Sequence, residues 1–382
     1  MATRVAYLAE SLGSVDRAWA LGMPELLRAS GGNAGNLAFW HAARLLFDAD
    51  EVTMISRDTR AAAVPASVEV VVIPAANYLH AGAELGRLAE LLRALNRPCL
   101  VVGLGVQAEV EAAPPALTAG TRDFLAELAR LAPTVCVRGD YTRDFCAALG
   151  VSNLAALGCP SLLINPDREL GAAIEARIAA LPESGPVAVH AACIKAPLQG
   201  VERELARLVR LEPGSAYLVQ RPLELMRAVH GEAMQGAEEQ AYFARCAGFL
   251  GFPGPEALGR FLRTHGRVPV SLADWAHGLR RFIAGVNTRI HGTIIGLMAG
   301  LPSLCVCHDT RTRELARQHC VPQLTPGGLI EHRHSLAALF AAAGFSGRAF
   351  DEGRARMAEG YADAVRAVGL VPSRHLLGFA AA

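Results

Sequence analysis

The chain has 382 residues, of which 52% are hydrophobic and 19% are charged, with 37 glycines and 21 prolines. This composition excludes a disordered or fibrous protein and favours a well-packed α/β protein. The length favours two domains, because one core seldom serves more than about 200 residues. The 37 basic and 36 acidic residues nearly cancel. No overall field therefore recruits nucleic acid or an anionic membrane, and an anionic ligand has to be bound by a local site.

Cysteine usage and hydropathy favour a cytoplasmic protein. Nine cysteines without repeated spacing fit a reducing compartment better than a disulfide framework. Cys305 and Cys307 lack a second pair at zinc-site spacing, so we interpret them as core residues and expect no metal. The N-terminus lacks the apolar stretch of a signal peptide. The longest apolar run, 294–307, contains Pro302 and is shorter than the ~20 residues of a membrane helix, so we expect no integral membrane segment.

The first half of the chain alternates strand-like and helix-like segments. Strands are predicted at 69–74, 99–103 and 134–137, and helices near 83–95, 122–131 and 141–149. A strand, helix, strand succession at this spacing implies parallel pairing with helices on both faces of a doubly wound sheet. Between the second and third of these strands, the Pro- and Ala-rich loop 109–121 is either a plain connector or a lid over a cleft.

The alternation resumes after a proline-bounded, helix-like segment at 165–185. Strands are predicted at 186–191, 216–220, 281–286 and 303–306, and helices at 199–211, 237–249, 255–264, after Arg289 and from Thr310. We therefore expect two Rossmann-like α/β domains, 1–165 and 166–345, facing each other across a cleft. A helical tail, 346–382, is expected to pack across the join.

The segment NTRIHG, 287–292, places two basic side chains at the start of a predicted helix. Asn287 or Thr288 is expected to cap that helix, so that Arg289 and His291 fall in its first turn. Basic residues oppose the helix dipole there, which indicates a bound anion that the guanidinium, the imidazole and free backbone N–H groups hold together. The alternative is that Arg289 pairs with a local carboxylate and that His291 is a core histidine.

Two other strand ends deliver arginines in the same way. Asp309 is expected to cap the next helix, with Arg311 in its first turn, and Arg138 follows the strand at 134–137. Arg138 is either a third anion ligand or the partner of Asp140 or Asp144.

In the first half, the loop GGNAGN, 31–36, joins an amphipathic helix. Gly35 and its neighbouring glycines let the backbone approach a ligand closely, while Asn33 and Asn36 either cap the helix or bind hydroxyl groups. The loop lacks the pattern of a nucleoside triphosphate site.

These segments, together with GLGVQA (103–108), VRGDYTRDFCAALGV (137–151) and GCPSLLINP (158–166), form an ordered set. The set resembles the polysaccharide pyruvyl transferase family from about residue 31 to residue 322. The resemblance implies a fold like that of GT-B glycosyltransferases. It also implies transfer of the pyruvyl group of phosphoenolpyruvate to two hydroxyls of a saccharide, giving a cyclic ketal and phosphate, with no cofactor.

By this resemblance, Arg138, Arg289 and His291 hold the donor. The two arginines would stabilise the departing phosphate, and His291 would act as acid or base because an imidazole titrates near neutral pH. Asn33, Gly35, Asn36, Gln107, Thr288, Asp309 and Arg311 are expected to bind substrate, with the acceptor on the first domain and the donor on the second. Asn287 stands where the family is expected to have glycine.

Two other readings remain open. A nucleotide-sugar glycosyltransferase uses the same scaffold, although no ribose-binding element stands out, and a non-catalytic sugar-binding relative would keep the fold. If the acceptor is lipid-linked, the cytoplasmic protein would work at the inner face of the membrane without an anchor of its own.

Overall fold

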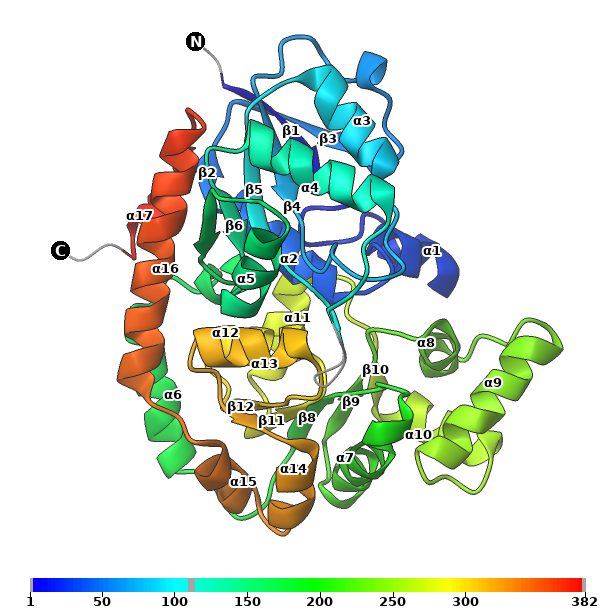
Figure 1. Cartoon of the computed structure of the whole chain (residues 1–382). Coiled ribbons are helices and arrows are strands. Elements are labelled where there is room, and N and C mark those ends of the chain that lie inside the picture. The colour runs from blue at the N-terminus through cyan, green and yellow to red at the C-terminus, as the bar shows by residue number, and fades with distance from the viewer. Residues whose placement is uncertain (1–2, 109–113, 380–382) are drawn as a thin grey trace.

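The computed structural model describes residues 3–108 and 114–379, so that 109–113 of the proposed lid loop lie outside the described residues. Its framework is two parallel six-stranded sheets, one above the other in Figure 1. The first sheet has the order β3-β1-β4-β5-β6-β7 and the second the order β10-β9-β8-β11-β12-β13. In each sheet the order in which the chain adds strands reverses once, between β1 and β4 in the first sheet and between β8 and β11 in the second. This is the doubly wound pattern expected from the sequence.

The first sheet is covered on both faces by helices. Its strands are β1 (Arg4–Leu8), β3 (Glu51–Ile55), β4 (Val70–Pro74), β5 (Cys99–Leu104), β6 (Val135–Val137) and β7 (Leu154–Ala156). The helices of the first half are α1 (Met23–Ala29), which packs against the second half, and α2 (Gly35–Arg44), α3 (Gly86–Leu95), α4 (Ala119–Leu131) and α5 (Asp140–Ala148), with short 3-10 turns η1 (Ala18–Ala20), η2 (Ala61–Ala63) and η3 (Pro160–Leu163).

Successive residues of a buried strand serve opposite layers. In β4, Val71 and Ile73 pack with α3 and α4, whereas Val70 and Val72 pack with α2 on the other face. A strand buried on both faces is continuously apolar, which explains why the segments at 69–74 and 99–103 were recognisable. β1 and β3 were missed, although β1 pairs with both β3 and β4 and is central to the sheet.

The second half repeats the design. Its strands are β8 (Val187–His190), β9 (Ala216–Leu218), β10 (Gly266–Arg267), β11 (Ala284–Asn287), β12 (Ser303–Val306) and β13 (Gln323–Leu324). Its helices are α6 (Leu170–Ala179), α7 (Gln199–Leu211), α8 (Leu223–His230), α9 (Gly236–Phe249), α10 (Pro255–His265), α11 (Leu272–Leu279), α12 (Ile290–Met298), α13 (Thr310–Gln318), α14 (Pro326–His332) and α15 (Leu336–Ala343), with the turn η4 (Ala196–Leu198).

The two halves share a core, because α12 of the second half packs on α2 and η3 of the first. The long helix α16 (Gly347–Ala367) runs along the side of both halves in Figure 1. Its buried Arg354 donates to the carbonyl oxygens of Leu162 at 2.9 Å and of Asp167 at 2.7 Å, and also to that of Asn165. Beyond it, β14 (Val371–Pro372) pairs with β2 (Phe47–Asp48), and α17 (Arg374–Leu377) ends the fold.

Candidate active site

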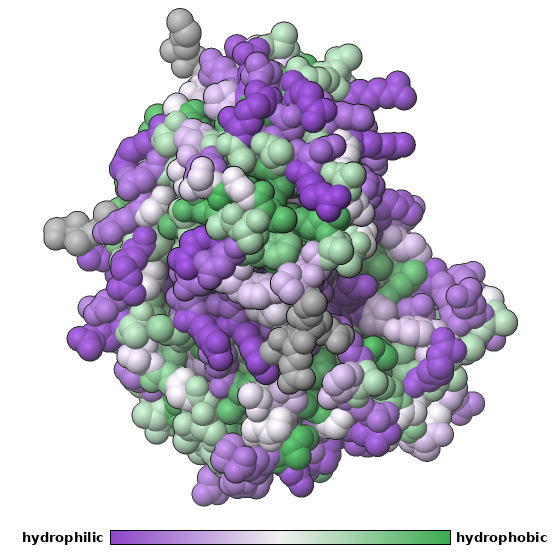
Figure 2. Space-filling view, in the orientation of Figure 1, coloured by the Kyte–Doolittle hydropathy of each residue, from purple (hydrophilic) through white to green (hydrophobic). Residues whose placement is uncertain are grey.

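A cavity of about 790 Å³ lies between the two sheets. Hydrophilic residues gather along the groove between the halves in Figure 2. The residues that line the cavity come mainly from loops that follow strands of either sheet, which is where ligands of open α/β sheets bind. Six basic side chains reach it: Arg57, Arg138, Lys195, Arg221, Arg289 and Arg311. Among the described residues, the carboxylates that line it belong to Glu10 and Asp309. This excess of positive charge favours an anionic ligand.

Arg289 lies in the turn from β11 to α12 and is itself the N-cap residue of α12, without a side-chain cap. The cap predicted at Asn287 or Thr288 was therefore wrong. Asn287 is buried and its Oδ1 accepts from the His190 backbone N–H at 3.0 Å. Thr288 is also buried, so it cannot bind substrate directly as predicted, and its hydroxyl donates to Glu202 at 2.7 Å.

The Arg289 guanidinium is held by backbone and not by a carboxylate. Its Nε donates to the carbonyl of Ala191 at 3.2 Å and its Nη2 to that of Ala192 at 2.6 Å. The proposed local ion pair is therefore absent among the described contacts of this side chain. A guanidinium carries five N–H groups, so three remain for a ligand in the cavity.

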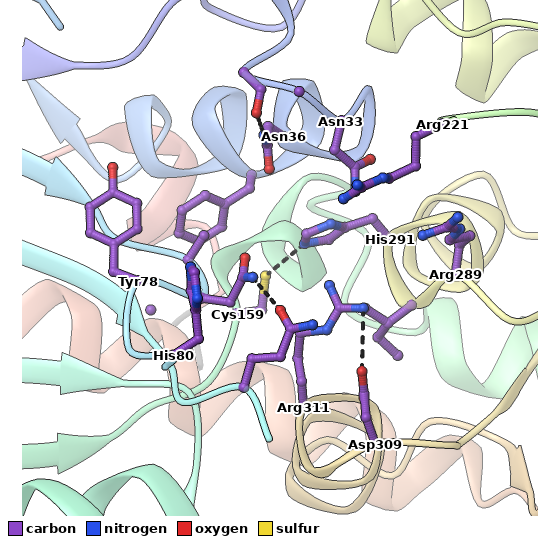
Figure 3. Close-up of a pocket in the computed structure, with 18 of the residues that line it drawn as sticks. Asn33, Asn36, Tyr78, His80, Cys159, Arg221, Arg289, His291, Asp309 and Arg311 are labelled. Atoms are coloured by element: carbon purple, nitrogen blue, oxygen red, sulfur yellow. Dashed lines mark hydrogen bonds and ion pairs between the residues drawn. The ribbon is translucent and has the colours of Figure 1, made fainter. Parts of the chain in front are cut away.

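His291 projects into the same space, in the centre of Figure 3. Its Nε2 lies 3.9 Å from the sulfur of Cys159. Burial, followed by repulsion from Arg311 and Arg138, lowers the pKa of the ring to about 3. The imidazole is therefore neutral at pH 7, which differs from the titration near neutrality expected of an unperturbed ring.

Gly35 is needed because the His291 ring touches it. A Cβ on Gly35 would stand 2.9 Å from His291 Nδ1 and 2.9 Å from Gln220 Oε1. Gly35 does not line the cavity, so its predicted contact with substrate is replaced by a packing contact with His291. Gln220 was not singled out from the sequence. It is buried, and its Nε2 has no hydrogen-bond partner.

Arg138 and Arg311 approach the cavity from opposite halves. Arg138 follows β6 and is buried, and its Nη1 has no hydrogen-bond partner. The pairing with Asp140 or Asp144 was wrong, because both carboxylates pair with Arg143. Burial, and then repulsion from Arg311, lowers the pKa of Arg138 to about 10. A bound anion would relieve both effects.

Asp309 has a structural role that does not depend on a ligand. As predicted, it caps α13, accepting from the Thr312 backbone N–H at 2.8 Å. Its carboxylate lies 3.8 Å from a nitrogen of Arg311. Burial opposes ionisation, yet Arg311, His308 and the capping bonds lower the pKa of Asp309 to about 2. Asp309 is therefore a fixed negative charge that orients Arg311.

The remaining predicted residues lie on the side of the cavity formed by the first half. The Asn33 side chain accepts from the Gly35 backbone N–H at 2.9 Å, and Asn36 donates to the Ser30 carbonyl at 3.0 Å and to the Gly31 carbonyl at 3.1 Å. Gln107 bonds the side chain of Asn77. All three line the cavity, but some of their hydrogen-bonding groups already bond to neighbouring loop residues and so shape the cavity wall.

A comparison of the chain with models of known protein families identifies its family. A family model described as polysaccharide pyruvyl transferase matches residues 33–310, which is more than half of the chain. The chain belongs to the polysaccharide pyruvyl transferase family. No curated protein matches it. The matched span contains Arg138, Arg289 and His291, and it ends one residue before Arg311.

The solved structures that the chain matches are distant from it in sequence. A UDP-N-acetylglucosamine 2-epimerase from Rickettsia bellii is 11% identical with a TM-score of 0.42, over 96% of this chain and 98% of that one. A family 9 glycosyl transferase from Veillonella parvula is 11% identical with a TM-score of 0.31, over 79% and 80% of the two chains. UDP-GlcNAc 2-epimerase from Neisseria meningitidis, bound to UDP-GlcNAc, is 9% identical with a TM-score of 0.40, over 94% and 100%.

Family membership makes the protein a transferase of polysaccharide biosynthesis, and its structure is built on two doubly wound α/β halves. Within the residues described, no helix combines the length and apolar character needed to cross a membrane.

Several residues that line the cavity were not predicted from the sequence. Arg57, Tyr78 and His80 follow β3 and β4, and Lys195 and Arg221 follow β8 and β9. Arg57 stacks on the Tyr78 ring, 4.3 Å from its centroid. Each of these residues stands just beyond a strand, so applying the strand-end rule to all strands, and not only to those before clear helix starts, would have found them.

Proposed function

We propose that this transferase moves the pyruvyl group of phosphoenolpyruvate to two hydroxyls of one saccharide, forming a cyclic ketal and releasing phosphate. The observation that carries the proposal is the convergence of Arg138, Arg289 and Arg311, from both halves, with N–H groups that have no partner in the protein. Phosphoenolpyruvate carries a phosphate and a carboxylate on three carbons. Several guanidinium groups within a small volume match that charge.

The atoms balance without an external acid or base. C3 of the donor gains one proton, the first hydroxyl oxygen bonds to C2, the C2–O bond to phosphate breaks, and the second hydroxyl oxygen bonds to C2. The two hydroxyls lose two protons. One balances the proton gained at C3, and the other leaves with phosphate. His291, whose ring is neutral, suits the role of accepting a hydroxyl proton. Binding the anionic donor beside it would raise its pKa, which makes the ring a stronger base for that proton.

In this proposal the donor and the acceptor bind to different halves of the protein. Residues 166–345 supply most of the donor site, completed by Arg138 of the first half. Residues 1–165 supply the acceptor side, where Tyr78 and Trp40 offer apolar faces and Asn33 offers hydrogen bonds to a saccharide. Aromatic rings and amides are the usual partners of sugar faces and hydroxyls.

Thermal unfolding with and without phosphoenolpyruvate tests this function. A ligand at 100 times its Kd stabilises by about 2.7 kcal/mol, a shift of a few degrees for this length. Arg289→Ala should abolish the shift, whereas Arg317→Ala, an exposed arginine farther along α13, should retain it. His291→Ala should keep donor binding but lose phosphate release in a screen of saccharide acceptors. A shift with nucleotides or nucleotide sugars and none with phosphoenolpyruvate would refute the proposal in favour of glycosyl transfer.

A further inference from the structure

Glu202, on the first turn of α7, is a completely buried carboxylate whose hydrogen-bond donors are all neutral. Its Oε2 accepts from the backbone N–H of Ala192 at 2.9 Å and from the Tyr217 hydroxyl at 3.3 Å. Its Oε1 accepts from the backbone N–H of Cys193 at 2.9 Å and from the Thr288 hydroxyl at 2.7 Å. No cation bonds Glu202 directly, although Arg289 lies close enough to attract it. A buried charge held only by neutral donors is costly, so its presence calls for a reason other than stability.

Three of the four donors lie on the two loops that form the donor side of the cavity, and the fourth, Tyr217, lies on β9. Ala192 and Cys193 follow β8, and Thr288 follows β11. These two strands are neighbours at the point where the strand order of the second sheet reverses. An ionised carboxylate accepts on both oxygens, whereas an amide would direct an NH₂ group at one of the two backbone N–H groups. The arrangement therefore requires glutamate and not glutamine.

The same loop holds Arg289. The carbonyls of Ala191 and Ala192 accept from its Nε and Nη2, while the N–H of Ala192 is bound to Glu202. Ala192 has a φ of 66°, in the left-handed region that non-glycine residues seldom adopt. Glu202 holds this peptide in its unfavourable conformation, with its carbonyl turned toward Arg289, and the Tyr217 hydroxyl, itself bonded to Glu202, accepts from the same N–H at 3.0 Å.

We propose that Glu202 is a positioning residue for the donor site: through the Ala192–Cys193 loop it aims the Arg289 guanidinium into the cavity. The inference rests on the proposed function, because the anion that Arg289 receives is taken to be that of phosphoenolpyruvate. Glu202 touches neither donor nor acceptor. It sets where the three free N–H groups of Arg289 point.

The sign of one substitution separates positioning from simple electrostatics. Glu202→Gln removes a negative charge near an anion site, so a through-space effect alone would tighten anion binding. Loss of the loop geometry weakens it. Titration calorimetry with phosphoenolpyruvate and with inorganic phosphate should give at least a tenfold larger Kd for Glu202→Gln. Glu204→Gln, the same change two residues along α7 at a side chain that pairs with Arg207, should stay within twofold of wild type.

A double-mutant cycle then tests whether Glu202 acts through Arg289. Arg289→Lys keeps the charge and measurable affinity but lacks the fork that reads both carbonyls. In that background Glu202→Gln should change the Kd by less than twofold. Equal weakening in both backgrounds, or binding by Glu202→Gln as tight as wild type, overturns the inference.

A milder variant covers the case in which Glu202→Gln does not fold. Thr288→Val removes one of the four donors and leaves the carboxylate in place. It should weaken binding by a smaller factor that again disappears in Arg289→Lys, and an unchanged Kd overturns the inference. If wild type binds neither phosphoenolpyruvate nor phosphate, the proposed function fails along with it. If wild type binds and the variants bind equally well, only the role of Glu202 fails.

Discussion

Gly35→Ala should disable the site while leaving the fold intact. The added Cβ would stand 2.9 Å from His291 Nδ1, about 0.5 Å short of the 3.4 Å at which ordinary contact begins. The imidazole is confined on its other side by Cys159, so it has to move by about that amount. A misplacement of 1 Å in a catalytic group costs on the order of 100-fold, so we expect about a tenfold loss of turnover.

Stability should hardly change. Gly35 is the first residue of α2, where alanine is favoured over glycine by up to ~1 kcal/mol, which offsets the contact. Gly353→Ala, in the middle of α16, is the matched control, because its Cβ would meet nothing within 4 Å. It should leave turnover unchanged.

The assay is phosphate release from phosphoenolpyruvate with an acceptor saccharide, beside a crystal structure of the variant. A displaced ring with reduced turnover is the expected result. Wild-type turnover in Gly35→Ala would refute the reasoning that His291 needs this position. Reduced turnover in Gly353→Ala as well would show that the loss is not specific to the contact.

Three further predictions follow from buried charges and rings. Arg138→Leu removes a buried guanidinium with an unpartnered Nη1, so the free protein should melt no earlier than wild type while the shift with phosphoenolpyruvate disappears; a retained shift would contradict its role. Burial lowers the pKa of His190 to about 4 and that of His319 to about 3, against an ordinary value of 6.5. The unfolded chain therefore takes up more protons as pH falls. Stability is complete above about pH 6.5 and is lost below it, by about 2 kcal/mol per ring at pH 5; denaturant unfolding should show the loss, and His319→Leu should remove its share. Arg354→Ala leaves the carbonyls of 162–167 without their buried donor and should cost about 3–5 kcal/mol in urea unfolding, so a loss below about 1 kcal/mol would contradict a structural role.

The sequence was most informative where a pattern is local. Strands β4, β5 and β12 and helices α7, α9 and α13 lie within a few residues of their predicted positions, because continuous apolar runs and helical spacing are visible in a short window. β1 and β3 were missed because neither is a fully buried apolar run: β1 opens on Arg4, and only Ile55 of the edge strand β3 is buried.

The candidate site divides in the same way. The basic residues of NTRIHG, of the α13 start and of the β6 end were recognisable, since each follows a strand in the sequence itself. Their shared cavity depends on how the two halves pack, which brings Arg138 beside Arg311. Glu202 gave no signal, because its partners lie on β9 and on two loops that only folding brings together.

By itself, therefore, the sequence determined two doubly wound α/β halves and the arginines and histidine at strand ends, because these follow from short-range periodicity and residue type, and its ordered motifs carried the resemblance to the family. Only the tertiary structure decided which of those groups meet, that Gly35 serves His291 and not the ligand, and that the ring is neutral. Those properties depend on burial and on the distance between charges, and both are set by contacts between residues more than 100 positions apart.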